Sequence, residues 1–398
     1  MHAKRAFEGV PAILEPGETR EQWESRRQEL LDAFERLEYG KRPPMEYQVR
    51  GTVKTEDEVF DGAATRRVVE IEIATSLGSH AFPLYLFVPK ANQPVPATLL
   101  ICSQSRHPAA MKMPDGVDLD AMQELVKSLG VIMDGPMPEV GAPRPLDMAT
   151  DMDNGHWPVP SIVARGHAAA GFYAADVEAD DAASYPSGLA KIFGTQTDRS
   201  DDCWGVLAVW AFAARCALDY LITVPELDSE RIGVIGHSRC GKAALWAGAQ
   251  DERFRWVVPN NSGCCGSALL RGKHGENLAS ITRFFPHWFA PGFARFAGRE
   301  ERLPIDQHML LALVAPRMLY VTSASEDAWS DPESEYHSTF LANEVFRLYG
   351  SPAMPEEMPQ PQTQVEAGAE GYHLRQGKHL LTEYDWMRML DHVERNLG

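Results

Sequence analysis

The sequence predicts a doubly wound α/β fold, in which a mostly parallel sheet is covered by helices on both faces. Three observations indicate this class. Short, continuously apolar runs alternate with helical segments, and such runs are typical of strands buried on both faces. Apolar residues make up 44% and charged residues 24% of the 398 residues, which is ordinary globular usage. The chain has no long internal repeat and no low-complexity tract, which excludes solenoids and propellers.

The first predicted element is an amphipathic helix within residues 16–40. Thr19 and Gln22 form a capping-box pattern at its start, and Gly40 follows its end. Its large apolar side chains share one helical face: Trp23, Leu30, Leu31, Phe34 and Leu37. We therefore expect residues 1–45 to be a helical extension that packs on a larger body.

The remaining elements alternate along the chain. Strands are predicted at 67–73, 82–88, 97–103 and 168–174. A helix capped by Asp201 and Asp202 should run to Val224, and it should be buried because it is apolar on nearly all sides. Further strands are predicted at 231–236, 254–259, 317–323 and 364–373, and further helices at 241–250, 332–348 and 382–397.

Two segments interrupt this alternation. Residues 107–155 are rich in Pro, Gly, Met and Asp, and residues 265–305 are rich in aromatic side chains and Arg. Long insertions in a compact domain are commonly functional loops. We therefore expect residues 1–398 to form a single domain with both insertions near the active site at the strand tips.

The charge balance excludes some classes of partner. The chain has 38 Lys and Arg residues against 56 Asp and Glu residues, a net charge of −18. Such a chain repels nucleic acid and anionic lipid, and no apolar run is long enough for a membrane helix. The first residues lack the apolar core of a secretory signal, so the sequence predicts no leader. It leaves open a cytoplasmic enzyme or a secreted one whose leader has been removed, and it leaves the oligomeric state open.

The cysteines are too few for a disulfide scaffold and show no spacing typical of zinc ligands. They are Cys102, Cys203, Cys216, Cys240, Cys264 and Cys265. We expect reduced thiols that serve as small core residues. Cys240 stands apart because it lies beside the candidate nucleophile.

That nucleophile is Ser238. A predicted strand runs directly into Gly236-His237-Ser238 and then into an Ala-rich helix, which is the context of a nucleophile elbow. Gly236 removes a Cβ that would clash in the turn, and the helix N-terminus favours negative charge beside the serine. The usual second Gly, two residues after Ser, is replaced by Cys240, and Gly241 follows one residue later.

A serine nucleophile needs a base, and in α/β-hydrolases the order along the chain is Ser, acid, His. His373 and His379 both lie in the right part of the chain. His373 sits in a strand-like run, whereas His379 occupies the loop before the last helix, which favours His379. His237 should point elsewhere by strand alternation and act as a structural donor.

The acid should follow the strand at 317–323. Asp327 is favoured over Glu326, and we expect Asp331 and Glu333 to cap the next helix. A Ser238, Asp327 and His379 set in this order predicts acyl transfer with no metal and no organic cofactor.

The segment Gly236-His237-Ser238-Arg239-Cys240-Gly241-Lys242 resembles the elbow of the glucuronoyl esterases, carbohydrate esterase family 15, which reads G-C-S-R-x-G-K. Only the Cys before Ser differs. Further similar segments lie at 39–43 (YGKRP), 249–254 (AQDERF), 260–266 (NNSGCCG), 303–308 (LPIDQH) and 375–379 (RQGKH), so the resemblance covers most of the chain.

The resemblance implies an α/β-hydrolase fold and cleavage of glucuronic acid esters of the type that links xylan to lignin alcohols. It implies that Ser238 is the nucleophile, that Arg239 holds the oxyanion and that Lys242 contacts sugar hydroxyls. Many members carry a catalytic Glu where this chain reads Asn260-Asn261-Ser262. An amide cannot serve as the anionic partner of His, so the acid should be Asp327.

The expected partner is therefore a carbohydrate ester. Trp329 is a candidate wall for the sugar because it lies beside Asp327, and the aromatic residues at 284–289 are further candidates. Another oxyanion donor is expected from the 103–107 loop. Two alternatives remain: a sugar O-acetyl esterase, since related bacterial chains are often called acetylxylan esterases, and a non-catalytic carbohydrate-binding relative.

Overall fold

The computed structural model describes residues 7–103 and 153–397, together with residues 124, 127–128, 130–132 and 147–148. The insertion expected at 107–155 lies almost entirely outside the described residues. The same holds for the oxyanion donor expected from the 103–107 loop, of which only Ser103 is described.

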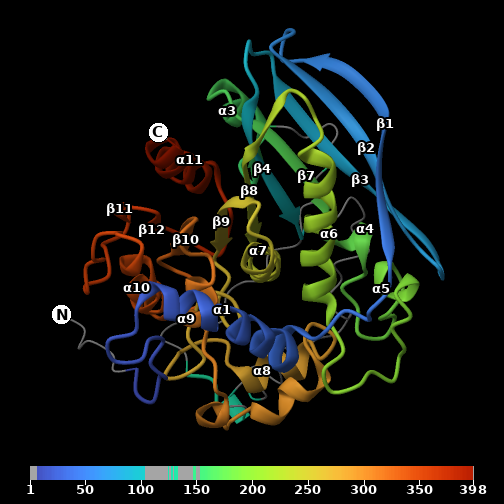
Figure 1. Cartoon of the computed structure of the whole chain (residues 1–398). Helices are drawn as coiled ribbons and strands as arrows, with labels where there is room; N and C mark the ends of the chain where they lie inside the picture. The colour runs from blue at the N-terminus through green and yellow to red at the C-terminus, as the bar shows by residue number, and fades with distance from the viewer. Residues whose placement is uncertain are drawn as a thin grey trace.

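A ten-stranded sheet forms the centre of the described structure, with the order β1-β2-β3-β7-β4-β8-β9-β10-β12-β11 (Figure 1). The strands from β7 to β12 in this order run parallel to one another, whereas β1, β2, β3 and β11 are antiparallel to their neighbours. The strands are β1 (Tyr47–Val59), β2 (Ala64–Thr75), β3 (Gly78–Pro89), β4 (Val95–Cys102), β7 (Ala168–Tyr173), β8 (Leu227–His237), β9 (Phe254–Asn260), β10 (Met318–Ala324), β11 (Thr363–Ala367) and β12 (Glu370–Arg375).

Helices cover both faces of this sheet, as the sequence predicts. Along β4, Leu99 and Ile101 join one apolar cluster, whereas Leu100 and Cys102 join another, because successive side chains of a strand point to opposite faces. The first cluster includes α6 (Val206–Leu221), α7 (Arg239–Gln250) and α10 (Pro332–Leu348); the second includes α3 (Val159–Ala164) and α11 (Glu383–Leu397). The doubly wound α/β class is confirmed.

Shorter elements connect this frame. They are β5 (Asp153–Asn154), β6 (Trp157–Pro158), α4 (Ala174–Val177), α5 (Leu189–Ile192), α8 (Leu278–Phe284), α9 (Gln307–Ala312) and the 3-10 turns Pro291–Phe296 and Glu300–Arg302. The segment expected as an insertion at 265–305 follows β9 and contains α8 and both 3-10 turns.

The N-terminal helix forms as predicted. Helix α1 (Arg20–Phe34) has Thr19 as its N-cap, and Thr19 and Gln22 make both hydrogen bonds of a capping box. A π-helical turn (Glu35–Tyr39) continues it, and Gly40 ends it at φ 84°. Packing stabilises this helix on the domain, because Trp23 and Phe34 are fully buried in the first apolar cluster.

Two local predictions are wrong, and one strand is missed. The helix expected from Asp201 and Asp202 begins only at Val206, since residues 203–204 pair instead with the segment at Lys41. The strand expected at 364–373 is a hairpin, because Gly368 turns the chain at φ 63° between β11 and β12. Strand β1 was not predicted: it is a sheet edge with mostly exposed side chains, so it lacks a continuous apolar run.

Five of the six cysteines are buried core residues, as the sequence predicts. All six are free thiols; Cys203 is half-buried and the other five are buried. Among the helices of the described residues, none is long and apolar enough to cross a membrane.

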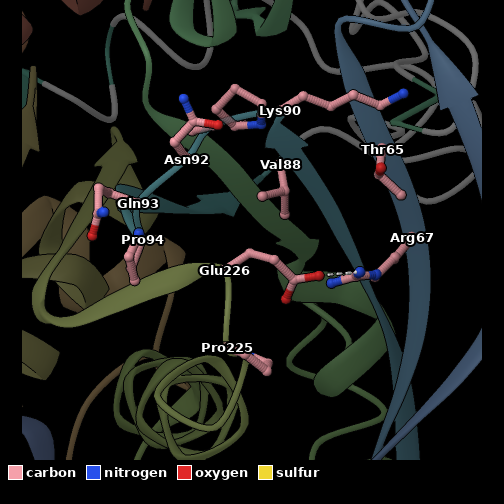
Figure 2. Close-up of a pocket in the computed structure, with 11 residues that line it drawn as sticks. Thr65, Arg67, Val88, Lys90, Asn92, Gln93, Pro94, Pro225 and Glu226 are labelled. Carbon is pink, nitrogen blue, oxygen red and sulfur yellow. Dashed lines mark hydrogen bonds and ion pairs between the residues drawn. The ribbon is translucent and has the colours of Figure 1, made fainter.

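The parallel strands bring the candidate residues to one edge of the sheet. Ser238 follows β8, Asp327 follows β10 and His379 follows β12, and the carboxyl ends of parallel strands share an edge. A hollow of about 390 Å³ lies at the opposite edge, before β4 and β8, where Arg67 and Glu226 form an ion pair at 2.6 Å (Figure 2). It contains none of the candidate residues.

Candidate active site

The turn after β8 holds Ser238 in the geometry of a nucleophile elbow. Its backbone angles are φ 57° and ψ −125°, and positive φ is rare and strained for residues other than Gly. The Ser238 N–H donates to the carbonyl of Asn260 at 2.9 Å, and its own carbonyl accepts from the N–H of Gly241 at 2.9 Å. Helix α7 begins at the next residue, so its positive N-terminal end favours negative charge beside the serine.

The departure from the usual elbow pattern is accommodated by two other glycines. A Cβ on Gly236 would lie 2.0 Å from the carbonyl oxygen of Cys240, and a Cβ on Gly241 would lie 3.0 Å from that of Gly236. The close backbone approach therefore falls at Gly236 and Gly241. Cys240 points into the core, where it is fully buried.

The predicted base and acid meet beside this elbow. Nδ1 of His379 lies 2.5 Å from Oδ2 of Asp327. The histidine side chain is 30% exposed, whereas that of Asp327 is 1% exposed. One member of the pair is thus open to a substrate while the other is shielded from water.

The surroundings of Asp327 keep it ionised. Burial alone would raise the pKa of its carboxyl, but the charge of His379 and its hydrogen bond, together with hydrogen bonds from Ser330, hold the pKa below its usual range. The backbone N–H of Ser330 donates to Oδ1 at 3.2 Å. An ionised carboxylate is the form that can orient an imidazole and stabilise its cation.

The alternative residues lie elsewhere. His373 is fully buried, with Nε2 2.8 Å from Asp385 and Nδ1 3.0 Å from the hydroxyl of Tyr320. Glu326 is exposed and accepts from Nε2 of Gln376 at 2.7 Å. Neither residue is placed to act with Ser238.

His237 lies beside the candidate base, although strand alternation predicted that it would point away. Its ring centroid is 4.5 Å from that of His379, and its Nδ1 donates to Oδ1 of Asn260 at 2.6 Å. The hydrogen bond to Asn260 agrees with the predicted role of His237 as a structural donor. Among the described residues, no hydrogen bond joins the hydroxyl of Ser238 to His379; such contacts are commonly long before substrate binds.

Arg239 is anchored by a residue that the sequence did not single out. Its Nη1 forms an ion pair with Oδ2 of Asp180, and the guanidinium lies 5.0 Å from the ring centroid of Trp288 and 5.5 Å from that of Phe285. The side chain remains 33% exposed. It therefore sits on an aromatic wall with donors left to meet a negative oxygen.

The carboxylate of Asp180 has three partners beside these aromatic rings. Besides Arg239, Nε2 of His287 lies 2.9 Å from Oδ1, and Nε1 of Trp288 donates to the same oxygen at 2.6 Å. Burial opposes ionisation, but Arg239 and these hydrogen bonds outweigh it and hold the pKa of Asp180 well below its usual range. Asp180 follows α4 and belongs to no local motif, so only the tertiary structure identifies it.

Lys242 and Trp329 occupy a neighbouring corner. Lys242 is 4% exposed, and its Nζ donates to the carbonyl of Ser262 at 2.7 Å and lies 3.9 Å from Oε2 of Glu276. Glu276 is joined in turn to Trp329 by a backbone hydrogen bond of 2.9 Å. The Trp329 side chain is half-buried, so part of it can meet a ligand. The sequence missed Glu276, a buried carboxylate in this corner.

The segment after β9 supplies amides instead of an acid. Asn260 accepts from His237 and donates to the hydroxyl of Thr322, and Nδ2 of Asn261 donates to the carbonyl of Leu380 at 3.2 Å. These amides brace the site but carry no charge. Among the described residues, no group of three or more His, Cys, Asp or Glu side chains could hold a metal ion.

The strand order together with the Ser238 elbow defines an α/β-hydrolase. Residues 137–350 match the family model described as glucuronyl esterase, fungi. Carbohydrate esterase MZ0003, from an unknown prokaryotic organism, is 33% identical over 382 residues, which cover 94% of this chain and 85% of that protein. A solved glucuronoyl esterase from Solibacter usitatus is 33% identical, with a TM-score of 0.82 over 99% of both chains.

A fungal relative is similar over a shorter stretch. The 4-O-methyl-glucuronoyl methylesterase 1 of Sodiomyces alcalophilus is 34% identical over 183 residues, or 43% of this chain and 37% of that protein. The chain belongs to the glucuronoyl esterase family, carbohydrate esterase family 15, and is a carboxylic ester hydrolase. The resemblance seen in the sequence is confirmed.

Proposed function

We propose that this chain hydrolyses esters of glucuronic acid carried on a carbohydrate, with Ser238, His379 and Asp327 as its catalytic triad. The observation that carries the proposal is the half-exposed His379 paired with the buried Asp327 beside the Ser238 elbow. The substrate class is supported by the relative whose name is 4-O-methyl-glucuronoyl methylesterase.

In the first step, His379 takes the proton of Ser238 as Oγ attacks the ester carbonyl. Asp327 holds the imidazole and stabilises its cation. His379 then gives the proton to the departing alcohol, which leaves an acyl-enzyme. In the second step His379 takes a proton from water, whose oxygen attacks the acyl carbonyl. The bond from the acyl group to Oγ of Ser238 then breaks, His379 returns the proton to Oγ, and the free acid leaves.

The negative oxygen of each tetrahedral intermediate would be met by the backbone N–H and the guanidinium of Arg239. Removal of one such donor raises the barrier by roughly 3–4 kcal/mol. Asp180 fixes the guanidinium against Trp288, so the donors are in place before charge develops. No step requires a metal or an organic cofactor.

The sugar would be read by Lys242, Glu276 and Trp329. A charged pair can bind hydroxyl groups from both sides, since Lys donates and Glu accepts. An indole face can pack on the apolar face of a sugar ring. The ester is uncharged until it is cleaved, so the net charge of −18 does not oppose its binding.

The test is turnover of benzyl glucuronate ester compared with release of acetate from acetylated xylan, with Ser238→Ala as control. We expect the glucuronate ester to be the better substrate by kcat/KM and Ser238→Ala to abolish its cleavage. Preferential release of acetate would favour the sugar O-acetyl esterase instead. If neither substrate is cleaved and an organophosphonate fails to label Ser238, the chain is a non-catalytic carbohydrate-binding relative.

A further inference from the structure

The loop that carries His379 (residues 376–381) lies between β12 and α11 and forms no helix or strand of its own. We propose that Arg375, held by Asp385, is the positioning residue that fixes this loop and so aims the His379 imidazole at Ser238. The inference rests on the proposed role of His379 as the base.

Arg375 contacts the residues on either side of His379 in the sequence. Its Nη2 donates to the carbonyls of Lys378 and Leu380, both at 2.8 Å, which are the residues directly before and after His379. Its Nη1 donates to the carbonyl of Gln376 at 3.1 Å. A guanidinium is planar, so its donors fix several acceptors in one geometry. Arg375 is only 6% exposed, so water does not compete strongly for these carbonyls.

Asp385 fixes the guanidinium from behind. Its Oδ2 accepts from Nε of Arg375 at 3.0 Å, from the N–H of Thr382 at 2.8 Å and from the Thr382 hydroxyl at 2.7 Å. Its Oδ1 lies 2.8 Å from Nε2 of His373. This buried carboxylate therefore ties β12 to the start of α11, the two ends between which the loop is suspended.

The same loop is also joined to the segment that carries the acid. The N–H of Ser325 donates to the carbonyl of Arg375 at 2.8 Å, and the N–H of Glu326 donates to the carbonyl of Gly377 at 2.9 Å. The two donor residues, Ser325 and Glu326, directly precede Asp327 in the sequence. A displacement of the loop would therefore change the separation of His379 from both Asp327 and Ser238.

Gly377 fits the loop closely around the guanidinium. Its φ is 124°, a conformation that side chains rarely allow, and a Cβ there would lie 2.9 Å from Nη1 of Arg375. The backbone at Gly377 therefore leaves space for the guanidinium of Arg375 but not for a side chain at position 377. A lysine keeps the charge but carries one nitrogen, so it cannot span the same carbonyls.

Arg317 offers a matched control. It is also 6% exposed, and it too donates to three carbonyls, those of Asp251, Phe254 and Leu313. It precedes β10, at the edge of the sheet opposite to the site. A change there removes an equivalent fork without touching the His379 loop.

The experiment compares Arg375→Lys and Arg317→Lys with the unchanged chain on benzyl glucuronate ester. We expect Arg375→Lys to lower kcat by about 10- to 100-fold, since a misplacement of about 1 Å can cost that much, with KM changed less than about twofold. Arg317→Lys should lower Tm and leave kcat and KM unchanged.

If Arg375→Lys loses stability only, as Arg317→Lys does, the inference is wrong. Should Arg375→Lys not fold, Arg375→Ala is assayed with added guanidinium ion, which should restore kcat at least about fivefold, whereas Arg317→Ala should gain nothing; no gain in Arg375→Ala overturns the inference. Failure of the proposed function would look different, because the unchanged chain would then be inactive or Ser238→Ala would remain active.

Discussion

Two His–Asp pairs lie close together near the carboxyl ends of the strands, and they differ in exposure far more than in length. His379 and Asp327 are 2.5 Å apart with the histidine side chain 30% exposed, whereas His373 and Asp385 are 2.8 Å apart with side chains 0% and 1% exposed. A short hydrogen bond therefore does not identify a catalytic histidine. Access to solvent distinguishes the pair proposed as catalytic from the other.

The contacts of the two aspartates show the same division. Asp327 has His379 and Ser330 as its partners, so its charge acts on the imidazole. Asp385 divides its charge among His373, Arg375 and Thr382, which belong to three adjoining segments. We interpret His379 and Asp327 as the pair that takes part in the reaction. We interpret His373 and Asp385 as a structural support for that pair.

The sharpest way to break this distinction is to exchange each histidine for glutamine. His379→Gln should lower kcat at least about 10⁴-fold, because the base is lost. His373→Gln should lower kcat by no more than about threefold, since a side-chain amide can still donate to Asp385. Steady-state kinetics on a glucuronate ester measure both, and a greater loss in His373→Gln would reverse the assignment.

Exchange of the aspartates should give a smaller contrast. Asp327→Asn should lower kcat by about 10⁴-fold, as expected when the partner of the base loses its charge. Asp385→Asn should lower kcat by about tenfold, acting through Arg375, while costing roughly 3 kcal/mol of folding stability. Kinetics and urea unfolding separate the two effects; equal losses of kcat would contradict the division of roles.

Both aspartates should contribute stability that is lost in acid. Favourable contacts lower the pKa of both carboxyls, although burial opposes this, so each binds a proton more weakly in the folded chain than in the unfolded one. Stability from these groups is therefore complete above about pH 4 and is lost as the pH falls through the folded pKa values. Tm should be measured between about pH 3 and 6, where carboxyl groups titrate. As the pH is lowered, Tm should fall less steeply in Asp385→Asn than in the unchanged chain. An unchanged slope would show that Asp385 contributes no such stability.

The smallest effect is expected at the neighbouring carboxylate. Glu326→Gln should leave kcat within about twofold, because Glu326 is exposed and contacts Gln376 rather than His379. The same ester assay measures it. A loss of several hundred-fold would transfer the role of acid from Asp327 to Glu326.

The sequence was sufficient to place candidate residues that are tied to local structure. Ser238 lies in a strand–turn–helix pattern, and Asp327 and His379 each follow a strand, so chain order and loop position predicted that Asp327 and His379 would meet beside the Ser238 turn. The doubly wound fold followed from the continuous apolar strands for a similar reason. These features depend on neighbours within a few residues.

Other parts depend on contacts that no local pattern records. Asp180 meets Arg239 across 59 positions, and Arg375 and Asp385 acquire their roles from a loop that folds between them. The sequence predicts one strand where β11 and β12 form a hairpin, because the turn at Gly368 has strand-like residues on both sides. The edge strand β1 was missed because exposure removes the apolar signal that the other strands carry.

The positive φ of Ser238 implies that the conformation of this turn lowers the folding stability of the chain. A side chain held at φ 57° costs on the order of 1–2 kcal/mol, and glycine would relieve that strain. A chain with Ser238→Gly, although inert, should therefore melt at a higher temperature than the active enzyme. The strain is therefore the structural cost of presenting a serine hydroxyl at this turn.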